Sequence, residues 1–314
     1  MNTVTAVLVG GPTVVLRYAG LTIVTDPTFD PPGTQESLTK TEGPAIDADA
    51  LPPIDLALVS HDHHPDNLDV IGLEVARGAT LDLTTLAGAA RKEGFRGMEP
   101  GDVATIDGPT AVTVTAVEAL HGPAKIAAEV GPVIGFVLRA DGWPTLYFSG
   151  DNALVSVVRG IARAHPDVSI ALLCMGAASV PNRGPVLLTL NADRAARVAA
   201  LWPDAAIVPV HVDGWKHFSQ QRVAALAGLN ANGVGDRVVA LERGVETPLN
   251  STARYLEARS SSIGSSSTNS MSISSTSTRS SAGDPAARGS SIMISTAAPS
   301  SATVSTEGRR PRTP

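Results

Sequence analysis

Cysteine is nearly absent from this 314-residue chain, which contains only Cys174. A single cysteine excludes a disulfide framework and a cysteine-rich zinc finger. Any bound metal ion would therefore have to be held by imidazole and carboxylate groups. Basic residues are also few, with 24 Lys and Arg against 30 Asp and Glu and a net charge of −6. This balance argues against nucleic-acid binding as the main task, because phosphate contacts need clustered basic side chains.

Long hydrophobic runs are missing as well. The apolar run at residues 6–9 stops at Gly10-Gly11-Pro12, which is too short for a signal-peptide core or a membrane span. No later stretch is long enough to cross a bilayer. From these absences we expect a soluble, cytoplasmic protein with no membrane partner.

Histidine and aromatic residues disappear from the chain after residue 260, where Ser and Thr dominate. A segment of this composition cannot bury enough apolar surface to offset the entropy lost on ordering. We therefore predict a disordered tail over residues 251–314 and a single folded domain over residues 1–250.

The first part of this domain consists of short β-branched and aliphatic runs separated by Gly and Pro, which is typical of strands. An irregular excursion at residues 26–53 and a short helix at 85–93 interrupt them. The predicted strands are residues 6–9, 13–17, 21–25, 54–59, 80–83, 103–106, 112–119, 134–139 and 145–148.

After Gly150 the pattern changes to alternating helices and strands. Helices are predicted at residues 153–164, 192–201 and 219–229, the last with Ser219 as N-cap, and strands at 168–173, 206–210 and 237–241. Two strand-rich halves that each end in helices indicate two sheets packed face to face with helices outside. The sequence thus predicts an α/β four-layer αββα sandwich with two mixed sheets.

Histidine and aspartate gather where predicted strands end. Each such position alone has an ordinary structural explanation, such as a polar turn or a helix cap. Four independent strand ends in one domain make a joint case for a metal site of imidazole and carboxylate, a set that suits zinc, iron or manganese. The residues are His61, His63, His64, Asp66, His121, Asp151 and His211.

These motifs resemble the metallo-β-lactamase superfamily, and within it the UlaG-like branch of metal-dependent hydrolases. Ser60-His61-Asp62-His63 is similar to the start of the family's His-x-His-x-Asp-His motif, and His121 to its isolated histidine. Ser149-Gly150-Asp151 resembles the segment with the bridging aspartate, and Val210-His211 the last histidine. The resemblance covers roughly residues 4–245 and implies the metallo-β-lactamase fold.

The first motif departs from the family pattern. Counted forward, His63 takes the second histidine position, but Pro65 then falls where the family has aspartate. Counted backward from Asp66, His64 takes that position and Asn67 falls where the final histidine belongs. One inserted residue reconciles the two alignments and leaves open which of the two histidines is the ligand. Asn is a poor ligand for a transition metal, so one or two bound ions remain open alternatives.

The resemblance implies a hydrolase in which a metal-bound hydroxide attacks a small-molecule lactone, ester or phosphoester. Zinc is the expected metal, as one or two ions, with manganese or iron as alternatives. Asp66 would orient the attacking water or accept its proton. The altered end of the motif sustains a different hypothesis, a degenerate member that binds metal or ligand without turnover. Homo-oligomer formation stays open. Trp215, Lys216, His217 and Phe218 could line the pocket or anchor the substrate, and core packing explains Trp215 and Phe218 at least as well.

Overall fold

A computed structural model describes residues 2–180 and 184–249 of the chain. The tail predicted over residues 251–314 lies outside the described residues. Within the described ranges, no helix combines the length and the apolar character that crossing a membrane requires.

Seven strands form the first sheet, in the order β15-β1-β2-β3-β6-β7-β8. Strands β15, β1, β2 and β3 pair antiparallel, whereas β3, β6, β7 and β8 pair parallel. The bounds are Val4–Gly10 (β1), Thr13–Tyr18 (β2), Leu21–Thr25 (β3), Leu56–Leu58 (β6), Leu81–Thr85 (β7), Arg96–Met98 (β8) and Glu246–Leu249 (β15). A separate hairpin consists of β4 (Gly33–Gln35) and β5 (Leu38–Lys40).

Six strands form the second sheet, in the order β14-β13-β12-β11-β10-β9. Strands β9 to β12 pair antiparallel, and β12, β13 and β14 pair parallel, so this sheet is also mixed. The bounds are Val103–Ile106 (β9), Val112–Ala119 (β10), Val133–Arg139 (β11), Thr145–Phe148 (β12), Val168–Cys174 (β13) and Ala206–Val210 (β14).

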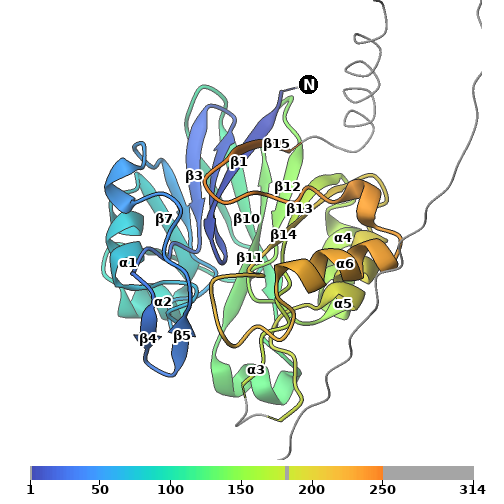
Figure 1. Ribbon diagram of the computed structural model, residues 1–314. Coiled ribbons are helices and arrows are strands. Elements are labelled where there is room, and N and C mark those ends of the chain that lie inside the picture. The colour runs from blue at the N-terminus through green and yellow to red at the C-terminus, as the bar shows by residue number, and fades with distance from the viewer. Residues whose placement is uncertain (1, 181–183, 250–314) are drawn as a thin grey trace, which may run out of the picture. The chain divides into compact units, whose positions relative to one another are not determined.

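Helices cover the outer faces of both sheets (Figure 1). α1 and α2 lie on the first sheet, and α4, α5 and α6 on the second, while α3 lies at the end of the molecule near the β4–β5 hairpin (Figure 1). The α-helices are Val70–Arg77 (α1), Leu86–Arg91 (α2), Ala124–Val130 (α3), Val155–Ala164 (α4), Ala192–Ala199 (α5) and Arg222–Ala231 (α6). Short 3₁₀ helices occur at Ala48–Ala50 (η1) and Gly235–Arg237 (η3).

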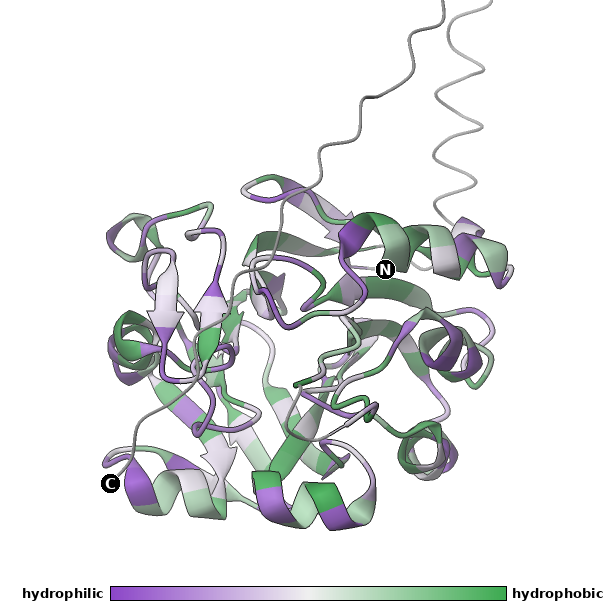
Figure 2. Cartoon of the chain, turned by 60° about the horizontal axis from the view of Figure 1, so that its bottom comes forward, coloured by the Kyte–Doolittle hydropathy of each residue, from purple (hydrophilic) through white to green (hydrophobic). Residues whose placement is uncertain are grey.

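Side chains that alternate along the strands build this layering. In β6, Leu56 and Leu58 belong to the core between the sheets, whereas Ala57 faces the layer of α1. Successive strand residues point to opposite faces, so a short apolar strand contributes to two layers at once. In Figure 2 many central strand segments are apolar, whereas the surrounding helices mix polar with apolar residues. The predicted αββα sandwich is therefore confirmed.

Several predicted elements differ in detail. The strand predicted at residues 237–241 is wrong: η3 occupies its start, and only a single bridge joins Val238 to Ile207. The last strand of the first sheet is instead β15, at an edge, where its internal Pro248 is tolerated. Ser219 does not cap α6, because the helix begins at Arg222 and the Ser219 hydroxyl donates to the Ala177 carbonyl. Helices α1 and α3 and strands β4, β5 and β8 were not predicted.

The ends of strands from both sheets meet at one edge of the sandwich. The backbone N–H of Ile134, in β11, donates to the Ser60 carbonyl just after β6 at 3.1 Å. In the second sheet, Cys174 at the end of β13 is paired with Val210 at the end of β14. Because these strands are parallel, their carboxyl ends deliver the residues that follow them to the same place.

Candidate metal centre

A buried carboxylate holds the loop that follows β6. Asp26 accepts hydrogen bonds from the backbone N–H of Ser60 at 2.6 Å, from the Ser60 hydroxyl at 2.8 Å and from the Asn67 amide at 2.9 Å. Both ends of the segment that contains the clustered histidines are thus tied to one side chain. Burial raises the pKa of Asp26 to about 7, although these hydrogen bonds oppose the shift.

Three histidines from two loops come together beside this segment. His61 Nε2 lies 3.0 Å from His64 Nδ1, and one ring nitrogen from each of His61, His64 and His121 lies within 4.8 Å of the others. The Nδ1 atom of His121 bonds to the Leu188 carbonyl at 2.7 Å, which directs its Nε2 atom toward the group. A hydrogen bond at the second nitrogen is the usual way in which a metal-binding imidazole is oriented.

His63 lies outside this three-histidine group. Its ring packs against His64 with centroids 4.5 Å apart, and its Nδ1 lies 4.0 Å from Asp62, which Arg91 pairs with. Its ring also contacts Gly131, where an added Cβ would lie 3.0 Å from it. Of the two alternatives left open by the sequence, the ring nitrogen of His64 joins those of His61 and His121 within 4.8 Å, although the His63 ring also lies 4.7 Å from that of His61. The ligand assignment itself stays a prediction.

Asp151 and His211 come from the ends of β12 and β14 and complete the predicted set. His211 Nδ1 lies 3.0 Å from Asp151 Oδ1, and His121 Nε2 lies 3.7 Å from Asp151 Oδ2. His211 adopts the left-handed conformation, with φ of 56°, and its backbone N–H donates to the Gly11 carbonyl. A non-glycine residue held there carries backbone strain, which is commonly found at functional sites.

Asp66 lies on the opposite side of His211, and it also contacts His217, which the sequence named only as a residue that could line the pocket or anchor the substrate. Asp66 Oδ2 is 3.3 Å from His211 Nε2 and 3.1 Å from His217 Nε2. His217 is on the loop after β14, which the buried Trp215 anchors. The sequence predicted no contact between His217 and Asp66. No strand end marks His217, and 151 residues separate it from Asp66, so no local pattern could have paired them.

The protonation states of His61, His64 and Asp151 suit metal binding, whereas Asp151 and Asp66 outweigh burial at His211 and hold its pKa well above the usual range. Burial, together with the neighbouring His121 and His63, lowers the pKa of His64 to about 4, although Asp66 opposes this. Burial raises the pKa of Asp151, but the nearby histidines outweigh it and hold this pKa well below its usual range. Neutral imidazoles and ionised carboxylates are the forms that bind Zn²⁺ or a similar cation.

Several polar atoms at the centre lack a hydrogen-bond partner among the described residues, although they are fully buried. They are Asp66 Oδ1, Asp151 Oδ2 and His211 Nε2. An unpaired buried polar atom is costly, and three of them in one place indicate a site built for a cation. The donor set of this chain therefore fits a divalent metal ion.

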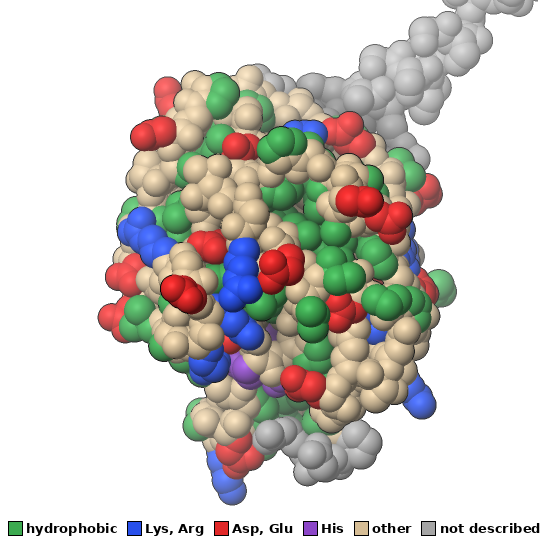
Figure 3. Space-filling model, turned by 90° about the vertical axis from the view of Figure 1, so that its left-hand side faces the viewer, with side chains coloured by type: hydrophobic (Ala, Val, Ile, Leu, Met, Phe, Trp, Pro, Cys, Tyr) green, Lys and Arg blue, Asp and Glu red, His purple; other side chains and the backbone are tan. Residues whose placement is uncertain are grey.

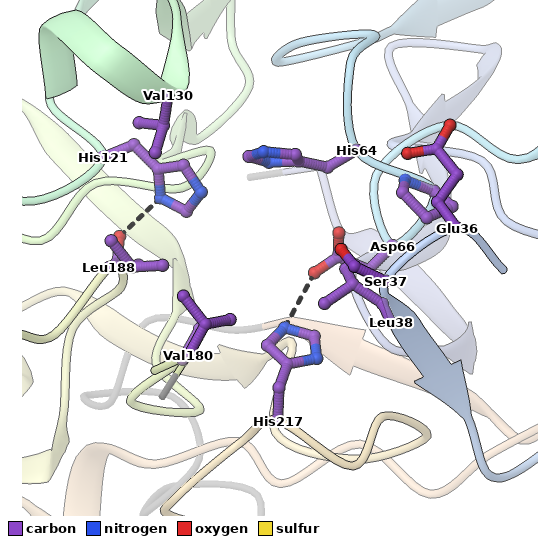
Figure 4. A pocket seen from close by; sticks show the side chains of 12 residues that line it. Glu36, Ser37, Leu38, His64, Asp66, His121, Val130, Val180, Leu188 and His217 are labelled. Atoms are coloured by element: carbon purple, nitrogen blue, oxygen red, sulfur yellow. Dashed lines mark hydrogen bonds and ion pairs between the residues drawn. The ribbon is translucent and has the colours of Figure 1, made fainter. Parts of the chain in front are cut away.

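The centre opens into a pocket of about 350 Å³. Figure 4 shows His64 and His121 on opposite sides of this pocket, with Asp66 and His217 paired below them. Apolar side chains form much of the remaining wall, among them Leu38, Val130, Val180 and Leu188. A small molecule that entered this pocket would meet the imidazoles and Asp66 directly.

The comparison with known families identifies the class to which this chain belongs. The profile described as the beta-lactamase superfamily domain matches residues 22–212. The chain is therefore a member of the beta-lactamase superfamily, as its motifs predicted. The narrower UlaG-like assignment stays a prediction.

Particular relatives are similar over part of their length. A UPF0173 metal-dependent hydrolase of Anaeromyxobacter sp. (strain K) is 32% identical over 140 residues, which are 41% of this chain and 51% of the relative. A homologue from Anaeromyxobacter dehalogenans is 29% identical over 174 residues, which are 52% of this chain and 61% of that protein. The chain thus spans about half to three fifths of the length of the curated relatives that it matches.

Solved structures share the fold at low sequence identity. An isothiocyanate hydrolase from Delia radicum gut bacteria has a TM-score of 0.67 at 19% identity, covering 79% of this chain and 99% of that one. A possible metal-dependent hydrolase from Veillonella parvula gives the same values. These likenesses confirm the architecture.

Proposed function

We propose that this chain is a metal-dependent hydrolase that acts on a small molecule. The observation that carries this proposal is that ring nitrogens of His61, His64 and His121 lie within 4.8 Å of one another beside a pocket that His64, His121 and Asp66 line. When bound, a divalent cation lowers the pKa of water and polarises a carbonyl or phosphoryl oxygen. The relatives named as metal-dependent hydrolases support the same reaction class.

Each residue of the site has a definite task in this proposal. His61, His64 and His121 would hold the ion, with Asp151 as a carboxylate ligand. Asp66 lines the pocket and is ionised: burial raises its pKa, but the neighbouring His211 and His217 outweigh burial and hold the pKa well below its usual range. It can therefore orient a water molecule or accept its proton.

The charge of the pocket favours a neutral substrate. None of the described residues that line it is Lys or Arg, and Glu36 is among them. A phosphoester anion would meet no basic side chain there, whereas a lactone or other ester needs only polarisation of its carbonyl oxygen. We therefore propose a lactone or carboxylic ester as substrate, ahead of a phosphoester, and zinc as the metal.

One face of the molecule lacks a feature that nucleic-acid binding requires. Figure 3 shows the face on which α1 and α2 lie, where acidic and basic side chains are interspersed rather than gathered in one basic band. Binding to a nucleic-acid backbone requires such a band.

Metal analysis and a substrate panel test the proposal. Purified protein should contain stoichiometric metal and should hydrolyse members of a lactone, ester and phosphoester panel, with activity lost in chelator and restored by Zn²⁺, Mn²⁺ or Fe²⁺. His121→Ala should lose metal and activity. His165→Ala is the matched control, because this histidine ends α4 away from the centre and should retain both.

Two results would change the conclusion. Absence of stoichiometric metal and of chelator-sensitive hydrolysis would refute the proposal. Metal binding that depends on His121, without turnover of any substrate class, would favour a protein that binds metal or ligand without catalysis.

A further inference from the structure

A second cavity adjoins the pocket beside the candidate metal centre. Its volume is about 420 Å³, and it shares four lining residues with that pocket, namely Ser37, Leu38, Val180 and His217. In Figure 4 these four residues lie below His64 and His121, on the side of the pocket where His217 is. Because the two spaces have these walls in common, a substrate whose reacting group lies beside the metal centre can extend into the second cavity.

Backbone hydrogen bonds fix the segment that forms one wall of this second cavity. The Lys216 N–H donates to the Thr39 carbonyl at 3.0 Å, and the Ser179 N–H donates to the His217 carbonyl at 3.1 Å. Trp215, the preceding residue, is fully buried. The backbone of Lys216 therefore has a defined position between β5 and the loop after β13, although its side chain is exposed.

The second cavity differs from the pocket in its charge. Lys216 lines it, and none of the described residues that line it is Asp or Glu. The pocket beside the metal centre has the opposite composition, with Glu36 and Asp66 but no Lys or Arg among its described lining residues. A neutral reacting group therefore suits the pocket, whereas an anionic group suits the second cavity.

Lys216 is free to bind such an anionic group. Among the described residues no carboxylate pairs with it, whereas Lys40, next to Thr39, is paired with Asp69 at 3.0 Å. An exposed lysine is usually only solvated, but this one borders a cavity that hydroxyl groups also line. The hydroxyl residues are Ser37, Thr39, Ser179 and Ser219. Ammonium and hydroxyl groups are donors from which a carboxylate accepts hydrogen bonds.

We infer that the second cavity is a subsite for an anionic end of the substrate, and that Lys216 determines this specificity. The inference rests on the proposed function and narrows its substrate class. The substrate would be an ester or lactone that carries a carboxylate at a distance from the reacting carbonyl. The reacting group itself stays neutral, in keeping with the charge of the pocket.

Matched esters with and without a remote carboxylate test this inference. Monophenyl adipate and phenyl hexanoate differ by a carboxylate on the acyl side, and 6-acetoxyhexanoate and hexyl acetate differ by one on the alcohol side. For at least one pair, the metal-loaded full chain should show a kcat/KM about 10-fold or more higher for the carboxylated member, as one hydrogen bond to a charged group would give. Because Lys216 is exposed, added salt should weaken this preference.

Three variants assign the preference to a residue. Lys216→Gln should lower the ratio of the two kcat/KM values about 10-fold, to near unity. Lys216→Arg keeps the positive charge and should keep the preference. Arg159→Gln, which replaces a cation by an amide at an exposed position of α4, is the matched control and should behave like the unmodified chain. Circular dichroism checks that each variant is folded.

The outcomes separate this inference from the proposed function. A preference that persists in Lys216→Gln, or that is absent from both pairs in the unmodified chain, would overturn the subsite, while hydrolysis of the neutral esters would leave the proposed function standing. Hydrolysis of none of the four esters would count against the proposed ester substrate. Saturation-transfer NMR then still tests the subsite, because 6-acetoxyhexanoate should give a weaker signal with Lys216→Gln than with the unmodified chain. Equal signals would overturn it.

Discussion

Ionisation of Asp26 should limit the stability of the metal-free protein near neutral pH. The side chain is fully buried, and it ties Ser60 and Asn67 together behind the histidine loop. Burial raises its pKa from the ordinary 3.8 to about 7. Between these two values the folded protein keeps a proton that the unfolded chain has already lost. Stability therefore falls as the pH rises through this window.

The size of this effect follows from the two pKa values. Linkage between 3.8 in the unfolded chain and about 7 in the folded protein gives a loss of about 2.5 kcal/mol from about pH 5 to about pH 7.5. Asp26→Asn removes the ionisation while its amide oxygen can still accept from the Ser60 N–H. The variant should therefore lack this component of the pH dependence.

Urea unfolding in the presence of a chelator, at about pH 5 and about pH 7.5, measures the difference. The unmodified chain should lose about 2.5 kcal/mol more than Asp26→Asn across this range. All other titrating groups are common to both proteins and largely cancel in the comparison. Asp49→Asn, the same chemical change at an exposed position, should behave like the unmodified chain. Equal losses in Asp26→Asn and the unmodified chain would refute this account of the buried carboxyl group.

Three further substitutions test how the fold is supported around the site and elsewhere. Lys40→Met removes a buried ammonium group that lies 3.0 Å from Asp69 Oδ2. Because the buried carboxylate then lacks its opposite charge, the free energy of unfolding measured in urea should fall by about 3–5 kcal/mol. A loss under about 1 kcal/mol would contradict this expectation. Gly72→Ala would place a Cβ 1.8 Å from the Pro27 carbonyl and should destabilise by about 3 kcal/mol or more in thermal unfolding. Gly160→Ala, in α4, places no atom within 4 Å of the added Cβ and should instead stabilise the protein by about 0.5–1 kcal/mol. Equal effects of the two glycine substitutions would exclude the clash with the Pro27 carbonyl as the cause.

The sandwich was predictable because apolar runs and glycine or proline breaks mark strands locally. The runs at β1, β2 and β3 lie within one or two residues of their predicted positions. Helix α1 was missed, although Asp69 caps it through a bond from the Gly72 N–H, because its apolar residues directly follow the histidine motif. Strand β15 was missed because Glu246 and Pro248 disfavour a strand, and only pairing with β1 forms it.

The candidate site was predictable to the extent that its residues follow strands. His121, Asp151 and His211 each lie within three residues of the end of a strand, and the structure brings them together with His61. The sequence could not decide between His63 and His64 as the ligand. The positions of the two rings depend on the conformation of the loop, which is set by contacts with β11 and α3. The contact between His217 and Asp66 could not be predicted for a similar reason, because only the packing of the two loops brings these side chains together.

The division of the site between the two sheets has a consequence for the order of events during folding. His61, His64 and Asp66 follow a strand of the first sheet, whereas His121, Asp151 and His211 follow strands of the second. A folding intermediate with only one sheet formed therefore holds at most half of these groups. The contacts that join the halves are long-range, and such contacts form slowly. Binding of an ion by the complete set of these groups therefore requires both sheets of the sandwich to be formed.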